Sequence, residues 1–150
     1  MNYLKESIHY KDSIGSWLEK LEDNLELGHI KFTAKENLAP TSYHRGLFLA
    51  CYYMKIANAI GIWNEISDTK RNRYTNFVKS FQKQNGYFLD YFMLTKMALG
   101  ATVSMLPRGK VSRWIKHIPQ CIRAETRQAS STLLMVDKKP NYLLPKPFKQ

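Results

Sequence analysis

The most informative stretch of the chain spans twelve residues and reads Phe77-Val78-Lys79-Ser80-Phe81-Gln82-Lys83-Gln84-Asn85-Gly86-Tyr87-Phe88. The apolar residues before Gln82 predict a helix, and Asn85-Gly86 predicts its end, because both residues tolerate a positive φ. The side-chain amide of Gln82 is suited to bond backbone groups left open at this turn, and Phe88 can lie over that amide. The stretch therefore predicts a structural staple and implies no chemistry.

The order of residue types in this stretch resembles the glutamine–tryptophan repeat of triterpene cyclases and related α/α-toroid proteins of the terpenoid cyclase and prenyltransferase type. In that repeat the glutamine ties off an outer helix and the final aromatic residue stacks nearby. These roles fall here on Gln82, Gly86 and Phe88, with Phe88 standing where the repeat usually has Trp. The resemblance implies helix hairpins arranged around an axis. It carries no activity over, since neither the aspartate-rich acid motif of the cyclases nor an Asp, Cys and His zinc trio can be placed on this sequence.

Helical periodicity extends in both directions from this stretch. The predicted helices cover about 13–27, 43–63, 68–84, 88–105, 110–118 and 122–136. Ser67 is the predicted cap of the third helix, and Pro119 is the predicted end of the fifth. No stretch has the alternation of a strand. The sequence therefore predicts an all-α fold of antiparallel helix hairpins in a partial toroid-like array, with a bundle of five or six helices as the alternative.

The most apolar segment, residues 43–63, has two explanations. Lys55 is its only charge after Arg45, so a membrane span has to be considered. Lys55, Asn58 and the adjacent Tyr52 and Tyr53 interrupt a segment that is already near the lower length limit for a span. We therefore expect a central helix buried by its neighbours.

The size of the chain suits one domain, because 150 residues can bury a sizeable core. We expect a single helical domain over residues 1–139 and an extended proline-rich tail over 140–150. The first residues lack the basic start and apolar run of a signal peptide. Two distant cysteines, Cys51 and Cys121, are typical of reduced thiols, so we expect a cytoplasmic protein.

Positive charge is concentrated in the second half of the chain. Residues 1–75 carry 10 Lys and Arg against 9 Asp and Glu, whereas residues 76–150 carry 13 against 3, and the whole chain has a net charge of +11. This asymmetry indicates an acidic partner such as nucleic acid, anionic lipid or a phosphorylated ligand, or a positive face that meets another domain or subunit.

Two basic segments are the candidate anion-binding sites. Arg123 and Arg127 are four residues apart, so they share a helix face and could clamp a phosphate or carboxylate. The segment 108–118 places Arg108, Lys110 and Arg113 beside an apolar face with Trp114, a pattern that suits an anionic membrane or a phosphate backbone. The alternative for the arginines is a solvated face, or a pair of Arg127 with a carboxylate such as Asp90. The alternative for 108–118, which we favour, is an ordinary surface helix whose Trp114 and isoleucines face the core.

Catalytic and metal-binding patterns are weak. The four histidines are scattered, with no pair at the i, i+4 spacing that places two imidazoles on one helix face. Cys121 has His117 and Arg123 as basic neighbours, but no third group is identifiable to orient a base. The sequence predicts no metal and no cofactor, and it leaves open whether the protein is an enzyme.

Three functions remain in view. The first is a toroid-like helical domain of a larger enzyme or complex, whose concave face holds a ligand or partner and is lined by Arg123, Arg127 and the aromatic residues around Trp63 and Tyr87. The second is a small basic module that binds a nucleic-acid backbone through residues 108–127. The third is peripheral attachment to anionic lipid through residues 110–118.

Overall fold

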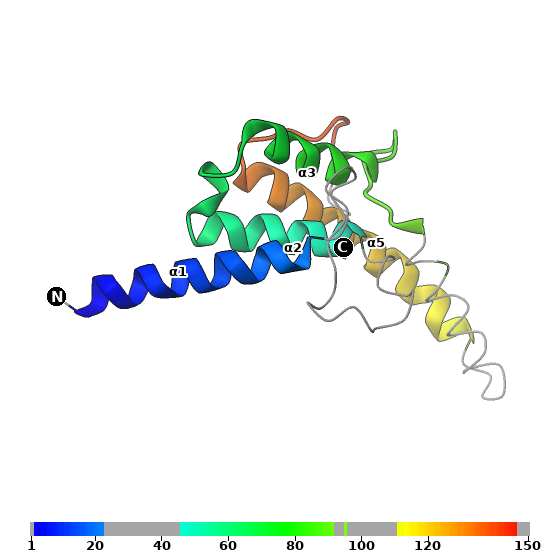
Figure 1. Ribbon diagram of the computed structural model, residues 1–150. Coiled ribbons are helices and arrows are strands. Elements are labelled where there is room, and N and C mark those ends of the chain that lie inside the picture. Colours follow the sequence, from blue (N-terminus) through cyan, green and yellow to red (C-terminus); the bar gives the residue numbers. More distant parts are fainter. Residues whose placement is uncertain (1, 23–45, 92–94, 96–110, 147–150) are drawn as a thin grey trace.

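The computed structural model describes residues 2–22, 46–91, 95 and 111–146 of the chain (Figure 1). Its elements are α1 (Asn2–Leu21), α2 (Gly46–Ala59), the short 3-10 helix η2 (Ile62–Asn64), α3 (Asp68–Ser80) and α5 (Val111–Met135). The described residues contain no strand, and Gln82 and Phe88 form an isolated β-bridge. The predicted all-α class is confirmed.

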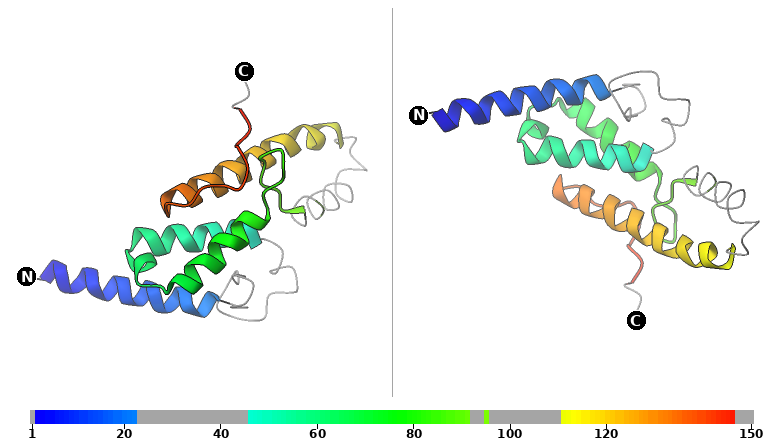
Figure 2. Two further views of the ribbon diagram at one scale, coloured as in Figure 1. Left: turned by 90° about the horizontal axis from the view of Figure 1, so that it is seen from above. Right: turned by 90° about the horizontal axis from the view of Figure 1, so that it is seen from below.

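Helix α2 is the centre of the arrangement and packs against α5, α3, η2 and α1. Both views of the ribbon show α2 and α5 running in the same direction, while α1 and α3 run in the opposite direction (Figures 1 and 2). Helices α1 and α5 lie on either side of α2, and α3 covers a third side. The apolar segment is therefore a central helix, as its sequence predicts, and none of the described helices is long and apolar enough to cross a bilayer.

The core forms where small residues let α2 and α5 approach closely. Ala50, Cys51 and Ala57 of α2 are completely buried, as are Ala129 and Thr132 of α5. Larger side chains surround this contact and complete the core: Leu18, Leu47, Met54, Tyr74, Val78, Phe88 and Leu133. Each fully buried Leu, Met or Phe side chain contributes roughly 1.5–3 kcal/mol to stability through the hydrophobic effect.

Buried hydroxyl groups on α5 are satisfied within the helix itself. Thr126, Ser130 and Thr132 each donate a hydrogen bond to the carbonyl oxygen four residues earlier, at 2.7–2.8 Å. This local bonding lets small polar residues face the core without leaving a buried polar group unpaired. The described side chains contain no buried nitrogen or oxygen without a hydrogen bond.

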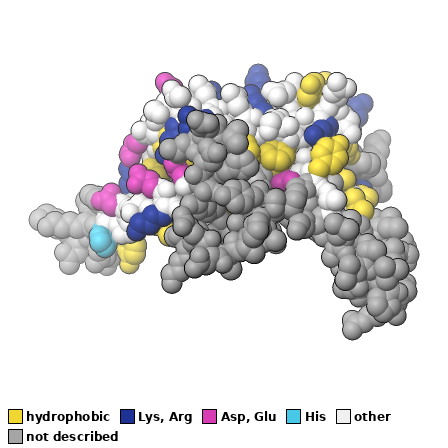
Figure 3. All heavy atoms as spheres, turned by 45° about the vertical axis from the view of Figure 1, so that its right-hand side comes forward, with side chains coloured by type: hydrophobic (Ala, Val, Ile, Leu, Met, Phe, Trp, Pro, Cys, Tyr) yellow, Lys and Arg dark blue, Asp and Glu magenta, His cyan; other side chains and the backbone are white. Residues whose placement is uncertain are grey.

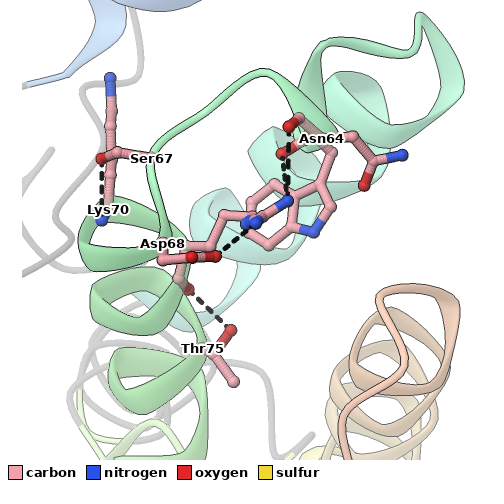
Figure 4. A network of polar contacts seen from close by, with 7 residues as sticks. Asn64, Ser67, Asp68, Lys70 and Thr75 are labelled. Atoms are coloured by element: carbon pink, nitrogen blue, oxygen red, sulfur yellow. Dashed lines mark hydrogen bonds and ion pairs between the residues drawn. The ribbon is translucent and has the colours of Figure 1, made fainter.

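A polar corner connects α2 to α3 (Figure 4). Gly61 takes a positive φ of 80° where α2 ends, and Trp63 of η2 is buried behind it. Ser67 is the N-cap of α3, since its hydroxyl accepts a hydrogen bond from the backbone N–H of Lys70. Arg71 donates to the carbonyl oxygens of Trp63 and Asn64 and pairs with Asp68 (Figure 4). The predicted cap is confirmed, and the corner is fixed by hydrogen bonds to orphan helix-end groups.

Helix α1 differs from its predicted form. It is already helical at Asn2 and has no cap at residue 12 or 13. Leu18 and Leu21 are buried as predicted, but Trp17 is 46% exposed. The 3.6-residue period places Trp17 at the edge of the apolar stripe, and α2 covers only the middle of that stripe.

Helix α5 corrects a second prediction. Pro119 does not end a helix, because α5 continues through it from Val111 to Met135. A proline inside a helix removes one backbone hydrogen bond and crowds the preceding turn, which costs roughly 3 kcal/mol. The packing of the later part of α5 against α2 outweighs this cost. The helices predicted at 110–118 and 122–136 are therefore one element.

Two further helix ends differ from the prediction. α2 ends at Ala59, so the prediction that it reaches Trp63 is wrong, because Gly61 turns the chain. α3 ends at Ser80, five residues before the predicted Asn-Gly stop. The predicted helix 88–105 falls largely outside the described residues.

Candidate functional site

The side-chain amide of Gln82 joins the end of α3 to the C-terminal tail. Its Nε2 donates to the carbonyl oxygen of Tyr142 at 2.9 Å and to that of Gly86 at 3.3 Å. Its Oε1 accepts from the backbone N–H of Tyr142 at 3.0 Å. The amide thus imitates a peptide group of a neighbouring strand, and it satisfies both backbone groups of Tyr142.

Residues 82–88 form a tight loop around this amide. The N–H of Lys83 donates to the carbonyl of Tyr87 and the N–H of Gly86 donates to that of Lys83, both at 2.8 Å. Gly86 has a φ of 85°, and a Cβ added there would lie 2.0 Å from the carbonyl oxygen of Leu143. Glycine is therefore required by backbone conformation and by the close approach of the tail.

The segment after the loop is fastened to α5. Phe88 is completely buried and its N–H donates to the hydroxyl of Thr126 at 3.1 Å. Two residues later, the N–H of Asp90 donates to a carboxylate oxygen of Glu125 at 3.3 Å. The staple predicted from Gln82, Gly86 and Phe88 is therefore a joint between α3, α5 and the tail.

A small pocket lies between this loop and α5. It has a volume of about 220 Å³ and is lined by Asn85, Tyr87, Leu89, Pro119, Ile122 and Arg123. Its walls are largely apolar, and Arg123 supplies the only formal charge among the lining residues. Such a pocket suits one apolar side chain or a small aromatic group that carries a negative charge beside it.

Glu125 lies next to the pocket-lining residues on α5. Burial raises the pKa of Glu125 to about 7; the hydrogen bond from the backbone of Asp90 opposes this rise, and the charge of Asp90 adds to it. Glu125 therefore gains or loses its proton close to neutral pH, at the point where the segment 88–90 is fastened to α5.

The predicted site residues do not all meet. Arg123 and Tyr87 share the pocket, whereas Arg127 is exposed one turn further along α5 and Trp63 is buried at the α2–α3 corner. Trp63 is therefore wrong as a lining residue, because it fills the core. Arg108 and Lys110 fall outside the described residues, and the side chain of Arg113 is not described.

The buried cysteine and the described metal-ligand side chains can be assessed from their surroundings. Burial raises the pKa of the Cys51 thiol to about 11, which keeps it protonated. Within the described ranges no cluster of three or more His, Cys, Asp and Glu side chains could hold a metal ion. His117 makes a local hydrogen bond of 3.0 Å with Gln120 instead.

A second, polar cleft between α1 and the α2–α3 corner was not predicted. Its volume is about 510 Å³ and its lining includes Tyr53, Lys70 and Glu65. Beneath it, one carboxylate oxygen of Glu22 accepts from the Tyr53 hydroxyl at 2.6 Å and pairs with Lys70 at 2.7 Å. At its rim Lys11 pairs with Glu65 at 2.5 Å. No periodicity signals these contacts, since each joins residues more than 30 positions apart in the sequence.

Comparison with known proteins adds no relative: no protein-family model, no curated protein and no solved structure matches the chain. The function has to be argued from the chain's own geometry.

Proposed function

We propose that the chain is a helical binding domain, one hairpin layer of a toroid-like array within a larger enzyme or complex. In this proposal the pocket between the Gln82 loop and α5 receives an apolar side chain of a partner, and Arg123 pairs with a neighbouring carboxylate. The single observation that carries the proposal is that Tyr87 and Arg123, from different elements, line one largely apolar pocket.

The order of the helices supports the array. In a layered hairpin array, inner helices run side by side in one direction and outer helices return in the other. α2 and α5 run in the same direction, as two inner helices would, and α3, which lies between them in the chain, runs in the opposite direction (Figure 2). Gln82 follows this outer helix directly, which is the position that the resemblance assigns to its glutamine.

The size of the pocket favours a side chain over a free cofactor. Ligand pockets usually enclose roughly 300–1,000 Å³, and this one is smaller, at about 220 Å³. An aromatic or branched side chain fills such a volume, and buried anchors of this kind dominate protein interfaces. The guanidinium of Arg123 would favour an acidic residue beside that anchor.

The test is an NMR titration of the chain with 3-phenylpropionate, a mimic of an aromatic side chain beside a carboxylate. We expect saturable shifts of the backbone amides of Leu89, Ile122 and Arg123. Arg123→Gln should weaken this binding while leaving that of the uncharged 3-phenylpropanol unchanged. Arg127→Gln is the matched control, because Arg127 lies on the same helix outside the pocket. Shifts spread over other surfaces, or equal effects of the two variants, would count against the proposal.

A further inference from the structure

Helix α3 and the C-terminal tail together carry a dense group of positive charges. Residues 68–83 and 137–146 contain eight Lys and Arg against two Asp, a balance of +6. We name the eight cations the basic strip: Lys70, Arg71, Arg73, Lys79, Lys83, Lys138, Lys139 and Lys146. Only Lys70 and Arg71 form an ion pair with a described residue. Within the described part of the chain, no carboxylate forms an ion pair with any of the other six.

The two halves of the basic strip belong to one surface. At one end, Lys138 lies close enough to Asp68 to help Arg71 lower the pKa of that carboxyl. At the other end, Tyr142 is bonded to Gln82. Between these two points the tail runs back alongside α3 (Figures 1 and 2). In the space-filling view, Lys and Arg side chains are spread over the upper surface, where few acidic side chains appear (Figure 3).

Two exposed tyrosines accompany these charges. The Lys83 ammonium lies 4.5 Å from the ring centre of Tyr91, which is 62% exposed. Tyr142 is 44% exposed, and its backbone is held by the Gln82 amide. A ring on a fixed backbone loses little conformational entropy when a flat partner stacks on it. Exposed aromatic rings beside cations are the features that single-stranded nucleic acid requires.

We propose that the basic strip binds single-stranded nucleic acid, with its phosphates on the lysines and arginines and unpaired bases stacked on Tyr91 and Tyr142. In a duplex the faces of the bases are stacked on one another. A duplex would therefore bind the lysines and arginines through its phosphates, but its bases could not stack on the two tyrosine rings. An anionic membrane would likewise engage the charges without a flat group for the rings to stack on. None of the basic-strip cations and neither tyrosine lines the pocket at Arg123, so the proposal does not depend on the partner-binding function.

The test measures binding of the full chain to fluorescently labelled poly-dT and poly-U strands of about 20 nucleotides, by anisotropy. An unlabelled duplex of equal length and anionic vesicles serve as competitors. We expect both single strands to bind more tightly than the duplex. The logarithm of the affinity should fall with the logarithm of salt concentration, by about 0.7 per phosphate contacted. Absence of binding at low salt, or stronger competition by the duplex or the vesicles, overturns the proposal.

Matched variants separate stacking from general charge. Tyr91→Ala and Tyr142→Ala should each weaken binding by about fivefold to a hundredfold. Tyr10→Ala should leave it unchanged, because Tyr10 is equally exposed but lies on α1. Lys139→Gln combined with Lys146→Gln should reduce the slope of log affinity against log salt by about 1.4. Lys20→Gln combined with Arg127→Gln changes the net charge by the same amount but should leave this slope unchanged. Equal losses in the strip and control variants would show non-specific attraction and refute the site.

Discussion

Gln82 is the residue on which the joint between α3, α5 and the tail depends. Gln82→Ala removes three hydrogen bonds to backbone groups of Gly86 and Tyr142. We expect a loss of about 2 kcal/mol in the free energy of unfolding, because each bond contributes about 1 kcal/mol and the tail groups can partly return to water. Urea denaturation measures the loss. Gln84→Ala, an exposed change in the same loop, should cost less than about 0.5 kcal/mol, and an equal cost for both variants would contradict the joint.

Gly86 and Gly61 distinguish two reasons why a position requires glycine: a positive φ, and the close approach of another backbone segment. Both have a positive φ, but a Cβ at Gly61 would meet nothing within 4 Å, whereas one at Gly86 would meet the Leu143 carbonyl. Gly61→Ala should therefore cost about 1 kcal/mol, the penalty for a side chain in the left-handed region. Gly86→Ala should cost at least about 3 kcal/mol or displace the tail. Thermal unfolding of the two variants tests this difference, and equal melting temperatures would refute the contact with the tail.

Glu125 makes stability depend on pH. Because burial raises the pKa of Glu125 from 4.5 to about 7, the folded chain holds this proton more tightly than the unfolded chain does. Its contribution to stability is therefore complete below about pH 4.5 and is lost as the pH rises through about 7. The size of this loss is on the order of 1 kcal/mol, once solvent screening of a partly exposed carboxyl is allowed for.

Comparison of wild type with Glu125→Gln isolates this group from the other titrating residues. Urea unfolding between about pH 5 and pH 8 should show the variant gaining stability relative to wild type as the pH rises. Asp137→Asn removes an exposed carboxylate near the end of α5 and serves as the control for a general loss of negative charge. A relative gain toward low pH would mean that the Glu125 pKa is lowered in the folded chain.

At the scale of elements, Pro119 tests the continuity of α5. If one helix runs from Val111 to Met135, Pro119→Ala restores a backbone donor and removes a clash inside it. We expect a gain of about 1–3 kcal/mol, since the proline is exposed and makes few core contacts. Differential scanning calorimetry measures the gain. If two helices met at Pro119, the substitution would bring no gain, because a proline at a helix boundary stabilises by restricting the unfolded chain.

The elements that could be predicted are those set by local chemistry. Ser67 has the side chain of an N-cap and is one, and the apolar run around Cys51 forms the buried central helix. The prediction that a helix ends at Pro119 is wrong because tertiary packing outweighs a local penalty of about 3 kcal/mol. The sequence pattern does not contain information on that packing. The early end of α2 could not be predicted either. A glycine in an apolar segment can adopt a negative or a positive φ, so the sequence does not show that Gly61 turns the chain.

The candidate site was predictable only in part. The bond of the Gln82 amide to the Gly86 carbonyl could be predicted, because both residues lie within one short segment. The partner of the Gln82 amide, Tyr142, lies 60 residues away and has no signal in the sequence. Arg123 was identified by its charge, but whether it or Arg127 reaches the pocket depends on how α5 is rotated against α2. Contacts of this kind are fixed by packing and not by local pattern.

At the scale of the whole molecule, packing is unequal among the helices. α2 is surrounded by α1, α3, η2 and α5, whereas α1 packs mainly against α2 and extends beyond the end of α2 (Figure 1). Polar contacts add to the attachment of α1, because Lys11 pairs with Glu65, and Glu22, directly after α1, pairs with Lys70. An exposed pair such as that of Lys11 with Glu65 contributes little to stability. Among the described side chains of α1, the buried ones are Leu18 and Leu21, which lie at its C-terminal end.

Native-state hydrogen exchange should reveal this gradient. We expect the slowest exchange in α2 and in the part of α5 near Ala129 and Leu133, where opening requires global unfolding. Amides of α1 before Lys11 should exchange fastest, and those near Leu18 at an intermediate rate. Lys11→Gln should speed exchange in the first half of α1 by a few-fold and leave α2 unchanged, since an exposed pair is worth less than about 1 kcal/mol. Uniform protection along α1 would mean that further contacts hold its N-terminal half. In that case α1 would not open away from the α2–α3 corner along the polar cleft, and the residues that line the cleft would be as rigid as the core.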